Sequence, residues 1–260
     1  MTKIHHINCG TLEVDGYPTV VCHCLLIQDH SVLALVDTGI GLNDIRNPVE
    51  RLGQSLIEQA GFRFREHDTA VKRTESLGLN PADVKHIILT HCDPDHVGGL
   101  ADFPNAEVHL SEEELNHSKS GNPRYVMTMF EHGPKWRTHA PSSRTWFGLE
   151  ARPISLNFES EILLIPLFGH TLGHCGVAVR KPDGGWLLHV GDAYYLRAEL
   201  TEEHHPVSAF AAMRADDDTR RLRSLKELRR LHYEHSDEIE LFGYHDLSEL
   251  PNGLDRKMPS

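Results

Sequence analysis

The sequence predicts an α+β protein, and three observations support this fold class. Short runs rich in Val, Ile, Leu and Cys, separated by polar turns, fill the first third of the chain and return in its second half. Segments with the apolar spacing of helices lie between and after these runs. A turn dense in potential metal ligands, His91-Cys92-Asp93-Pro94-Asp95-His96, directly follows one of the apolar runs.

The first part of the chain is expected to begin with strands and to continue with helices. The strands predicted within the first 110 residues are residues 4–9, 19–28, 31–37, 85–90 and 106–110. Two helices are expected between them, over residues 43–60 and 69–77, and Gly78 closes the second. A further helix is expected after His96.

The second half is expected to return to strands before one long helix. The predicted strands are residues 162–167, 175–180, 186–190 and 239–243. Asp183-Gly184-Gly185 supplies a hairpin turn between the second and third of them. Residues 216–235 form a helix, because acidic residues stand at its start and four leucines are spaced along it: Leu222, Leu225, Leu228 and Leu231.

Residues from about 111 to 152 break the alternation of strands and helices. Ser111 is a good helix cap followed by three acids, but Gly and Pro are then interleaved with aromatic residues and methionines. Two of the three tryptophans lie here. This segment is interpreted as an insertion that forms either a substrate cap or a packed surface excursion. Together with the loop around residues 62–68, it is where substrate selectivity is expected.

Length and composition limit the class of protein. The 260 residues suit a single domain over residues 1–260. A net charge of −12 argues against a nucleic-acid partner, which would need clustered Lys and Arg. The sequence shows no secretory signal and no apolar stretch long enough for a membrane span. Five cysteines without zinc-ribbon or CxxC spacing fit reduced thiols, so a cytoplasmic location is expected.

The ligand turn indicates a metal site. It carries His91, Asp93, Asp95 and His96 on a loop that leaves the carboxyl end of an apolar strand. Carboxylates and imidazoles packed this closely would repel one another or leave polar atoms unpaired unless a cation organised them. The turn therefore suits one or two divalent cations better than it suits packing. The count of 20 histidines also directs attention to metal chemistry.

Each later apolar strand of the second half leads to another candidate ligand. Those residues are His170, Asp192 and His245, and the first two directly follow a glycine. Side chains at the carboxyl ends of strands can converge on one edge of a sheet, whatever their separation in sequence. Each of these residues alone is weak evidence for a metal site. Together, in this order after the ligand turn, they form a specific pattern.

This ordered set resembles that of the metallo-β-lactamase superfamily of metallohydrolases. The resemblance spans nearly the whole chain and implies an αβ/βα sandwich, in which two mixed β-sheets lie back to back with helices outside. It implies that His91, Asp93 and His170 hold one metal, that Asp95, His96 and His245 hold a second, and that Asp192 bridges them. A metal-bridging hydroxide would then be the nucleophile. Asp95 would steer it or move its proton, and Asp37 and His174 would support the ligands through hydrogen bonds.

Asp93 departs from the family pattern, which has histidine at this position. An added carboxylate lowers the positive charge of the site and favours harder metals. Zinc is the default metal, and the added carboxylate makes iron or manganese the alternatives. If Asp93 does not bind a metal, the site would hold only one. Flavodiiron proteins of the same superfamily carry an acid at the matching position, although this chain has no room for their flavin domain.

Within the superfamily the sequence is most similar to the N-acyl homoserine lactone lactonases. The segments Asp37-Thr38-Gly39-Ile40 and Gly191-Asp192-Ala193-Tyr194-Tyr195 carry this likeness. It implies that Tyr195 hydrogen-bonds the carbonyl oxygen or the leaving alkoxide of the opened ring. The expected function is a dinuclear metal-dependent hydrolase of an ester-like carbonyl, with a small-molecule lactone as the first candidate. A thioester hydrolase, an iron-dependent oxidoreductase and a module with a structural metal remain as alternatives, and a homodimer is left open.

Overall fold

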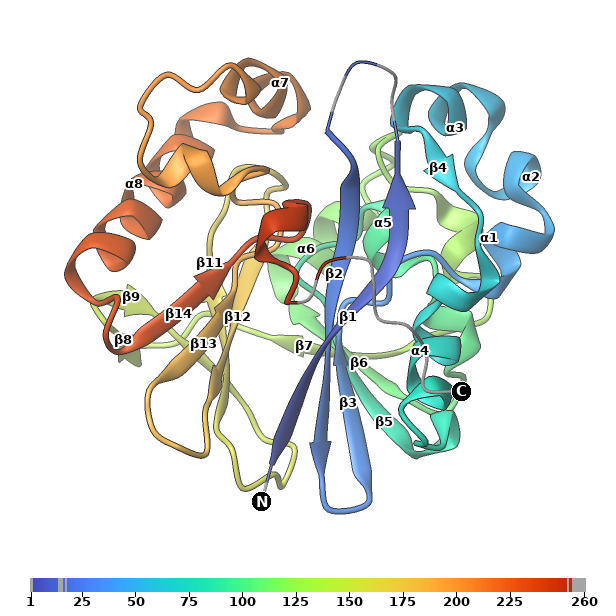
Figure 1. Ribbon diagram of the computed structural model, residues 1–260, viewed down its shortest axis with the longest axis horizontal. Coiled ribbons are helices and arrows are strands. Elements are labelled where there is room, and N and C mark those ends of the chain that lie inside the picture. Colours follow the sequence, from blue (N-terminus) through green and yellow to red (C-terminus); the bar gives the residue numbers. More distant parts are fainter. Residues whose placement is uncertain (1, 14–15, 17, 252, 254–260) are drawn as a thin grey trace.

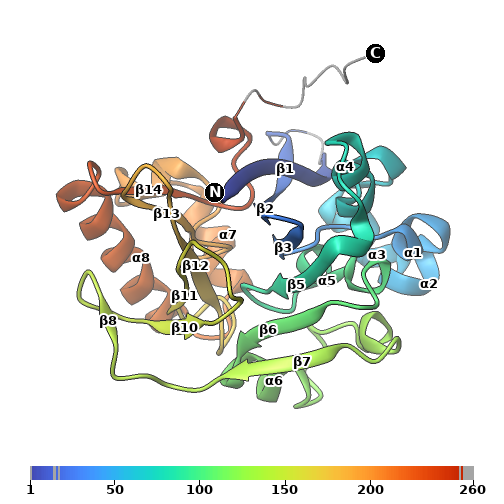
Figure 2. The same ribbon diagram turned by 90° about the horizontal axis from the view of Figure 1, so that it is seen from below.

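The computed structural model describes residues 2–13, 16, 18–251 and 253. Within these residues two β-sheets pack face to face, and helices cover the outer face of each (Figures 1 and 2). This arrangement is the expected αβ/βα sandwich, so the predicted fold class is confirmed. The prediction of one domain over residues 1–260 includes residues that lie outside the described part.

The first sheet contains, within the described residues, seven strands in the order β4-β1-β2-β3-β5-β6-β7. Their bounds are β1 Lys3–Leu12, β2 Val20–Asp29, β3 Val32–Val36, β4 Phe62–Arg63, β5 Val84–Ile88, β6 Glu107–Ser111 and β7 Lys135–His139. Neighbouring strands from β4 to β3 are antiparallel, whereas β3, β5, β6 and β7 run parallel. The carboxyl ends of β3 and β5 therefore lie at the same edge.

The second sheet contains, in the described part of the chain, five strands in the order β10-β11-β12-β13-β14. Their bounds are β10 Arg152–Ile154, β11 Ile162–Pro166, β12 Cys175–Arg180, β13 Trp186–His189 and β14 Ile239–Phe242. The β12–β13 pair is antiparallel, as the Asp183-Gly184-Gly185 turn predicts, and β13 and β14 are parallel. Because β12 is antiparallel to β11 as well, β11, β13 and β14 all end at one edge.

The two sheets enclose the central part of the core. Apolar side chains of the first sheet, among them Leu25 and Val36, pack against Leu164 and Val177 of the second. Each sheet also packs against its outer helices through one further apolar cluster. Five cysteines, among the residues described, are buried and free of disulfide bonds. No helix in the described ranges is both long and apolar enough to cross a membrane.

The helices differ from the sequence prediction at three places. The α-helices are α1 Leu42–Arg46, α2 Pro48–Leu52, α3 Gln54–Ala60, α4 Ala70–Ser76, α5 Pro94–Val97, α6 Glu112–Ser118, α7 Val207–Arg214 and α8 Asp218–Glu234. The single helix expected over residues 43–60 is wrong. Pro48 begins a new helix because its ring suits a first turn, and Gly53 at φ 77° ends that helix.

The helix expected after His96 is wrong, because the helix there spans Pro94–Val97 and stops before Gly98 and Gly99, which are poor helix formers. The helix Val207–Arg214 was not predicted.

Short elements connect these helices and strands. The 3-10 turns are η1 Glu66–Asp68, η2 Pro81–Asp83, η3 Leu100–Asp102, η4 Met127–Phe130, η5 Arg197–Leu200 and η6 Leu247–Glu249, and a small hairpin joins β8 Thr145–Trp146 to β9 Leu149–Glu150. Within residues 111–152, β7 extends the first sheet along β6. Much of this segment is therefore integral to the sandwich, and residues 119–134 are its irregular part.

Helix α8 covers the second sheet with three of the four predicted leucines. Leu225, Leu228 and Leu231 are buried, but Leu222 is 49% exposed. Residues three apart fall about 60° behind a full helical turn, so a stripe of four leucines rotates away from the sheet. The buried Arg221 takes the inward position in the first turn and binds Asp218.

Leu228→Ala should lower the free energy of unfolding by about 2–5 kcal/mol, because the truncated side chain leaves a cavity between α8 and the second sheet. Leu222→Ala on the same helix is the matched control and should change it by less than about 0.5 kcal/mol. Urea unfolding measures both. Equal losses in the two variants would contradict this assignment of the helix face.

Candidate metal centre

The seven predicted ligands meet at the edge where the strands of both sheets end. His91, Asp93, Asp95 and His96 follow β5, and the other three follow β11, β13 and β14. Their side chains are almost completely buried, except that of Asp95, which is 16% exposed. The strand ends thus bring together residues that are up to 154 positions apart in the chain.

The donor atoms form two groups that share a carboxylate between them. One group comprises His91, His170 and Asp192, and the other comprises Asp95, His96 and His245; within each group the atoms lie within 4.8 Å of one another. Asp192 reaches both groups. Its Oδ2 lies 3.4 Å from His170 Nε2 and 3.3 Å from His245 Nε2, and its Oδ1 lies 3.3 Å from His96 Nε2.

Three donor atoms of this centre are buried without a hydrogen-bond partner. They are His91 Nε2, His96 Nε2 and Asp192 Oδ1. A buried polar atom left unpaired costs about 1–3 kcal/mol, so such atoms are rare unless a ligand satisfies them. Imidazole nitrogens and carboxylate oxygens are ligands of divalent transition metals. The residues present therefore fit a divalent cation.

Hydrogen bonds outside the centre orient the ligand rings. His96 Nδ1 lies 2.8 Å from Asp37 Oδ2, and His245 Nδ1 donates to the carbonyl oxygen of Val21 at 3.0 Å. With Nδ1 engaged in this way, Nε2 of each ring keeps its lone pair for the centre. Asp37 also accepts from the amide and hydroxyl of Thr90, and it adopts φ 55°, a conformation that Asp tolerates better than most residues.

His174 holds the backbone beside Asp192 instead of a ligand ring. Its Nδ1 donates to the Leu167 carbonyl, and its Nε2 accepts from the Asp192 amide, each at 3.0 Å. Burial and the neighbouring His170 lower the pKa of His174 to about 3, which keeps Nε2 an acceptor. Gly191, at φ 54°, is required here because a Cβ would lie 2.6 Å from that nitrogen.

The charge of the centre favours cations. Burial lowers the pKa of His91 well below its usual value, which leaves a neutral imidazole. Burial opposes ionisation of Asp192, but His245 and His96 hold the pKa of its carboxyl well below the usual range. Burial also opposes protonation of His96, yet Asp192, Asp37 and Asp95 together raise its pKa. The carboxylates therefore create a strongly negative potential at the ligand rings.

Asp93 differs from the other predicted ligands because its carboxylate is ion-paired to Arg124. Arg124 Nε lies 2.5 Å from Asp93 Oδ1, and Arg124 Nη2 lies 2.7 Å from Oδ2. The same Nη2 lies 2.6 Å from His170 Nε2. Sequence reasoning missed Arg124, and the only signal for it was the unusual acid at position 93.

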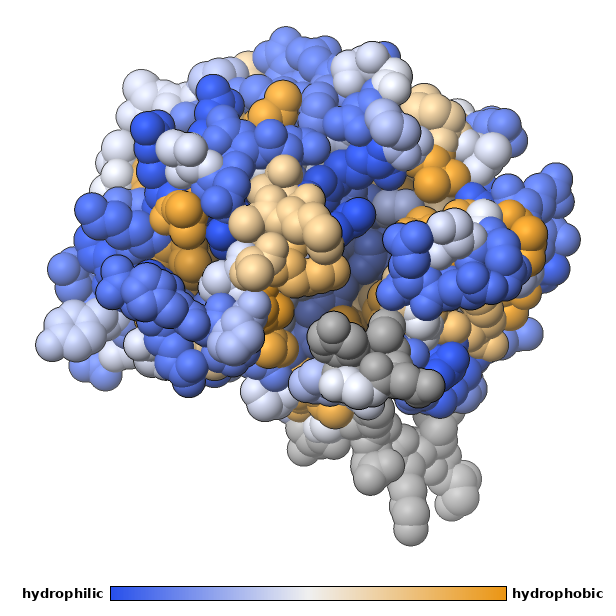
Figure 3. Space-filling model, turned by 90° about the horizontal axis from the view of Figure 1, so that it is seen from above, coloured by the Kyte–Doolittle hydropathy of each residue, from blue (hydrophilic) through white to orange (hydrophobic). Residues whose placement is uncertain are grey.

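Tyr195 lies beside the ligand rings. Its ring stacks on His245 with centroids 5.4 Å apart and meets His170 edge-on at 5.9 Å. Phe210 of α7 packs against its other side at 5.4 Å. Phe210 and Met213 are 48% and 74% exposed. Figure 3, which looks onto the top of Figure 1, shows an apolar patch beside a polar hollow at this face.

Two further buried residues that sequence reasoning missed support the ligand turn. Glu114 of α6 accepts hydrogen bonds from the Cys92 amide and the hydroxyls of Thr171 and Tyr125, and burial raises its pKa to about 7. Tyr244 stacks on His96 with centroids 3.8 Å apart and donates to the Asp95 carbonyl. Both fix the backbone from which the ligands project.

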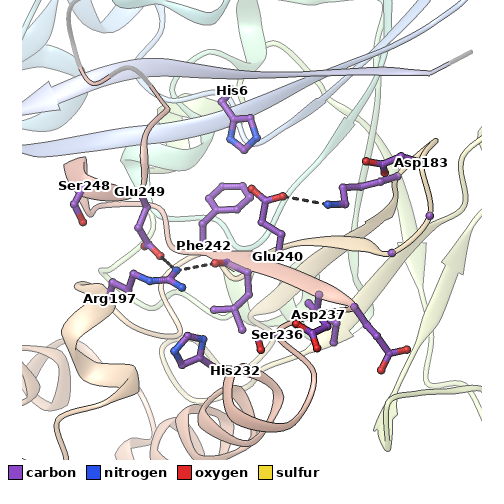
Figure 4. A pocket seen from close by; sticks show the side chains of 16 residues that line it. His6, Asp183, Arg197, His232, Ser236, Asp237, Glu240, Phe242, Ser248 and Glu249 are labelled. Carbon is purple, nitrogen blue, oxygen red and sulfur yellow. Dashed lines mark hydrogen bonds and ion pairs between the residues drawn. The ribbon is translucent and has the colours of Figure 1, made fainter.

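A separate hollow of about 790 Å³ lies along β14, and none of the seven predicted ligands lines it. Figure 4 shows two ion pairs among its lining residues. Arg197 binds Glu249 at 2.7 Å, and Lys181 binds Glu240 at 3.3 Å. Among the described residues, none of the clusters of three potential metal ligands lines this hollow.

The fold and the ligand set define a metallohydrolase-type sandwich, and comparison with known families agrees. Residues 17–234 match the metallo-beta-lactamase superfamily, and the chain belongs to this family. The resemblance that the sequence carried is thereby confirmed.

Relatives of known name support the same family. A probable metallo-hydrolase of Mycobacterium tuberculosis is 40% identical over 208 residues, which cover 76% of this chain and 64% of that protein. The chain thus spans less than two thirds of that relative's length. The N-acyl homoserine lactonase AttM of Azorhizobium caulinodans is 27% identical over 173 residues, which cover 65% of this chain and 61% of that protein.

Solved structures share the fold. An N-acyl homoserine lactone hydrolase with N-hexanoyl-L-homoserine bound at its catalytic metal centre matches with a TM-score of 0.72 and 19% identity, covering 95% of this chain and 94% of the other. A dizinc quorum-quenching lactonase, AidC, matches with a TM-score of 0.59 and 19% identity, covering 90% and 75%. At this identity the likeness establishes the fold alone.

Asp37→Asn should weaken the binding of a divalent cation by about 10–100-fold, because the charge that orients His96 is lost. Competition with a chromogenic chelator measures the affinity, and circular dichroism checks the fold. Asp68→Asn is the control, since Asp68 is equally buried but pairs with Arg73 and Thr11. An unchanged affinity in Asp37→Asn would show that Asp37 serves folding only.

Proposed function

We propose that this protein is a metal-dependent hydrolase that attacks an ester-like carbonyl, with a small-molecule lactone as substrate. One observation carries the proposal: two groups of donor atoms share Asp192, and some of these atoms are buried without partners. A purely structural site is closed by its protein ligands, whereas unpaired donors at an accessible edge suit catalysis. The names of the lactonase relatives support the lactone.

The ligand assignments are part of the proposal. His91, Asp93 and His170 would hold one cation, Asp95, His96 and His245 a second, and Asp192 would contact both. Zinc is the default metal, and the extra carboxylate of Asp93 keeps iron and manganese as alternatives. Bound divalent cations supply Lewis acidity toward a carbonyl oxygen and lower the pKa of a water that serves as nucleophile.

Asp95 is proposed as the group that handles the proton of the attacking water. Its Oδ2 lies 3.6 Å from His245 Nε2 and 4.0 Å from His96 Nε2. Its side chain is also the most exposed of the seven ligands, so a water entering the centre can reach it. A carboxylate in this position can accept a proton and return it to the leaving alkoxide.

Tyr195 is proposed to hydrogen-bond the substrate. Its ring lies against both His170 and His245, so its hydroxyl belongs to the same small volume as the ligands. Burial raises the pKa of Tyr195 and keeps the phenol protonated as a donor. A donor aimed at a developing oxyanion is among the larger contributions to catalysis.

The apolar side chains of α7 suit an acyl group. Phe210 packs on Tyr195, and Met213 lies further along the same helix with most of its surface exposed. A lactone with an N-acyl chain would bury apolar surface there. Residues 119–134 and the loop around 62–68 remain proposed as further sources of selectivity. A cytoplasmic location and a homodimer also remain proposals; the free cysteines support the former.

The alternative functions differ in their support. The iron-dependent oxidoreductase rested on the acid at position 93, and the ion pair of that acid with Arg124 weakens the argument. A thioester hydrolase would use the same nucleophile and the same apolar surface. It therefore remains the second candidate.

A substrate panel tests the proposal. Metal-free protein is reconstituted separately with zinc, iron and manganese and assayed on N-acyl lactones of several chain lengths, thioesters and phosphoesters. Lactone opening that requires a cation, with the fold intact after chelation, is expected. Thioester turnover without lactone opening would favour the second candidate, and unfolding on chelation would indicate a structural metal.

Tyr195→Phe should lower kcat for lactone opening by about 10-fold or more while KM changes little, because only the hydrogen bond to the developing oxyanion is removed. Steady-state kinetics on one lactone measure the change. Tyr233→Phe is the matched control, because Tyr233 is 89% exposed. Equal kcat values in the two variants would reject the role of Tyr195.

A further inference from the structure

The guanidinium of Arg124 contacts Asp93 and His170, two of the residues proposed to hold the first cation. Nε and Nη2 of Arg124 donate to the two carboxylate oxygens of Asp93, and Nη2 also lies within hydrogen-bond distance of His170 Nε2. This is a bidentate pair of the strongest kind between ionised side chains. The inference drawn from it rests on the proposed function, since it concerns the same centre.

A hydrogen bond from Arg124 and a bond to a cation would use the same electrons of His170. The neutral imidazole has a single lone pair, on the nitrogen that carries no proton. At 2.6 Å from Nη2, His170 Nε2 directs that lone pair to the guanidinium. Asp93 likewise directs both oxygens to Arg124. A cation bound through His170 Nε2 must therefore break the contact with Arg124, whereas the carboxylate oxygens of Asp93 have further lone pairs.

The guanidinium also supplies the charge that a metal would supply. Arginine does not lose its proton in proteins, so the guanidinium of Arg124 stays positively charged beside Asp93. The negative charge of Asp93 is thus balanced by a cation of the protein itself.

Further contacts hold Arg124 in this position. Its side chain is only 8% exposed, its Nη1 donates to the Arg214 carbonyl at 2.6 Å, and Asp216 lies 3.6 Å from the same nitrogen. Moving the guanidinium out therefore breaks contacts to α7 as well as to Asp93 and His170. Arg124 is fixed, in contrast to a surface arginine that changes rotamer freely.

In the part of the chain that the structure describes, no arginine or lysine pairs with the second group of ligands. Among the described residues, the ion pairs of Asp95 are those with His96 and His245. His96 Nε2 and Asp192 Oδ1 are both without hydrogen-bond partners. His91 Nε2 of the first group is unpartnered as well, so both halves retain free donor atoms. The halves are unequal because a guanidinium contacts Asp93 and His170 in the first, whereas among the described residues none contacts the second.

We propose that Arg124 is a built-in cation that fills the first metal position. The chain then holds one divalent cation tightly, among Asp95, His96, Asp192 and His245, and takes a second only by displacing Arg124. Asp93 fits this arrangement because a carboxylate forms the bidentate pair with arginine, which a histidine at that position could not form.

The number of bound cations tests this proposal without reference to activity. Wild-type protein, Arg124→Met and Arg214→Met are dialysed against limiting and excess zinc or manganese, and bound metal is measured by mass spectrometry. Wild type should bind one cation per chain, and Arg124→Met should bind two. The second cation should bind at least about 30-fold more tightly to Arg124→Met than to wild type, as expected from losing a charge-assisted hydrogen-bond pair.

Two variants control the measurement. Arg214→Met removes a guanidinium that is 43% exposed and lies 3.9 Å from Asp93, and it should retain one cation per chain. Arg124→Lys keeps the charge but cannot bridge Asp93 and His170 in the same way, so it should bind the second cation with intermediate affinity. It also provides the comparison if Arg124→Met fails to fold.

Two equally tight cations in wild type, or a single cation in both folded Arg124 variants, would overturn the proposal and leave the proposed function standing. Absence of bound metal from every variant, with the fold intact, would instead reject the metal-dependent hydrolase itself. The two failures are therefore distinguishable in one experiment.

Discussion

The structure depends on one constraint: Asp192 is buried among three histidine rings and must stay ionised there. An isolated carboxylate in such a place would be protonated or would destabilise the fold. The rings of His96, His170 and His245 lie 3.3–3.4 Å from its oxygens and make the charge tolerable. They come from strand ends in both sheets, so the sandwich must close correctly before the charge is satisfied. Folding and assembly of the centre are thereby linked.

The sequence predicted the part of this arrangement that strands determine locally. An apolar run followed by a polar residue defines a strand end, and strand ends converge, which is why the mixed class and the convergence of the seven candidate ligands could be inferred early. The sandwich itself and the division of the ligands between two metals were implied by the family resemblance. The same reasoning failed where local signals were weak. The helix expected over residues 43–60 divides at Pro48 and Gly53, and β4, with two residues, is too short to produce a periodic pattern.

Contacts from distant irregular segments could not be predicted. Arg124 lies 31 positions after Asp93 in a segment without periodicity, and no spacing rule joins the two. The high number of histidines was also misleading, because several of them lie outside the metal centre. His86, His109 and His139 instead form a chain of ring-to-ring hydrogen bonds across β5, β6 and β7. Burial lowers the pKa of His109 to about 3, so this chain is neutral.

The unequal halves of the centre determine how a substrate can approach. Arg124 and the residues that bind it close the side of Asp93 and His170, whose side chains are 5% and 0% exposed. Tyr195 and Phe210 cover His245 with aromatic surface. Asp95, at 16% exposure, is the ligand that solvent reaches best. A reacting carbonyl would therefore enter over Asp95, with its apolar part against α7 and its polar part toward the half of the centre that Arg124 does not contact. Because the proposed proton carrier and the open path coincide at Asp95, the same side chain would control both access and proton transfer.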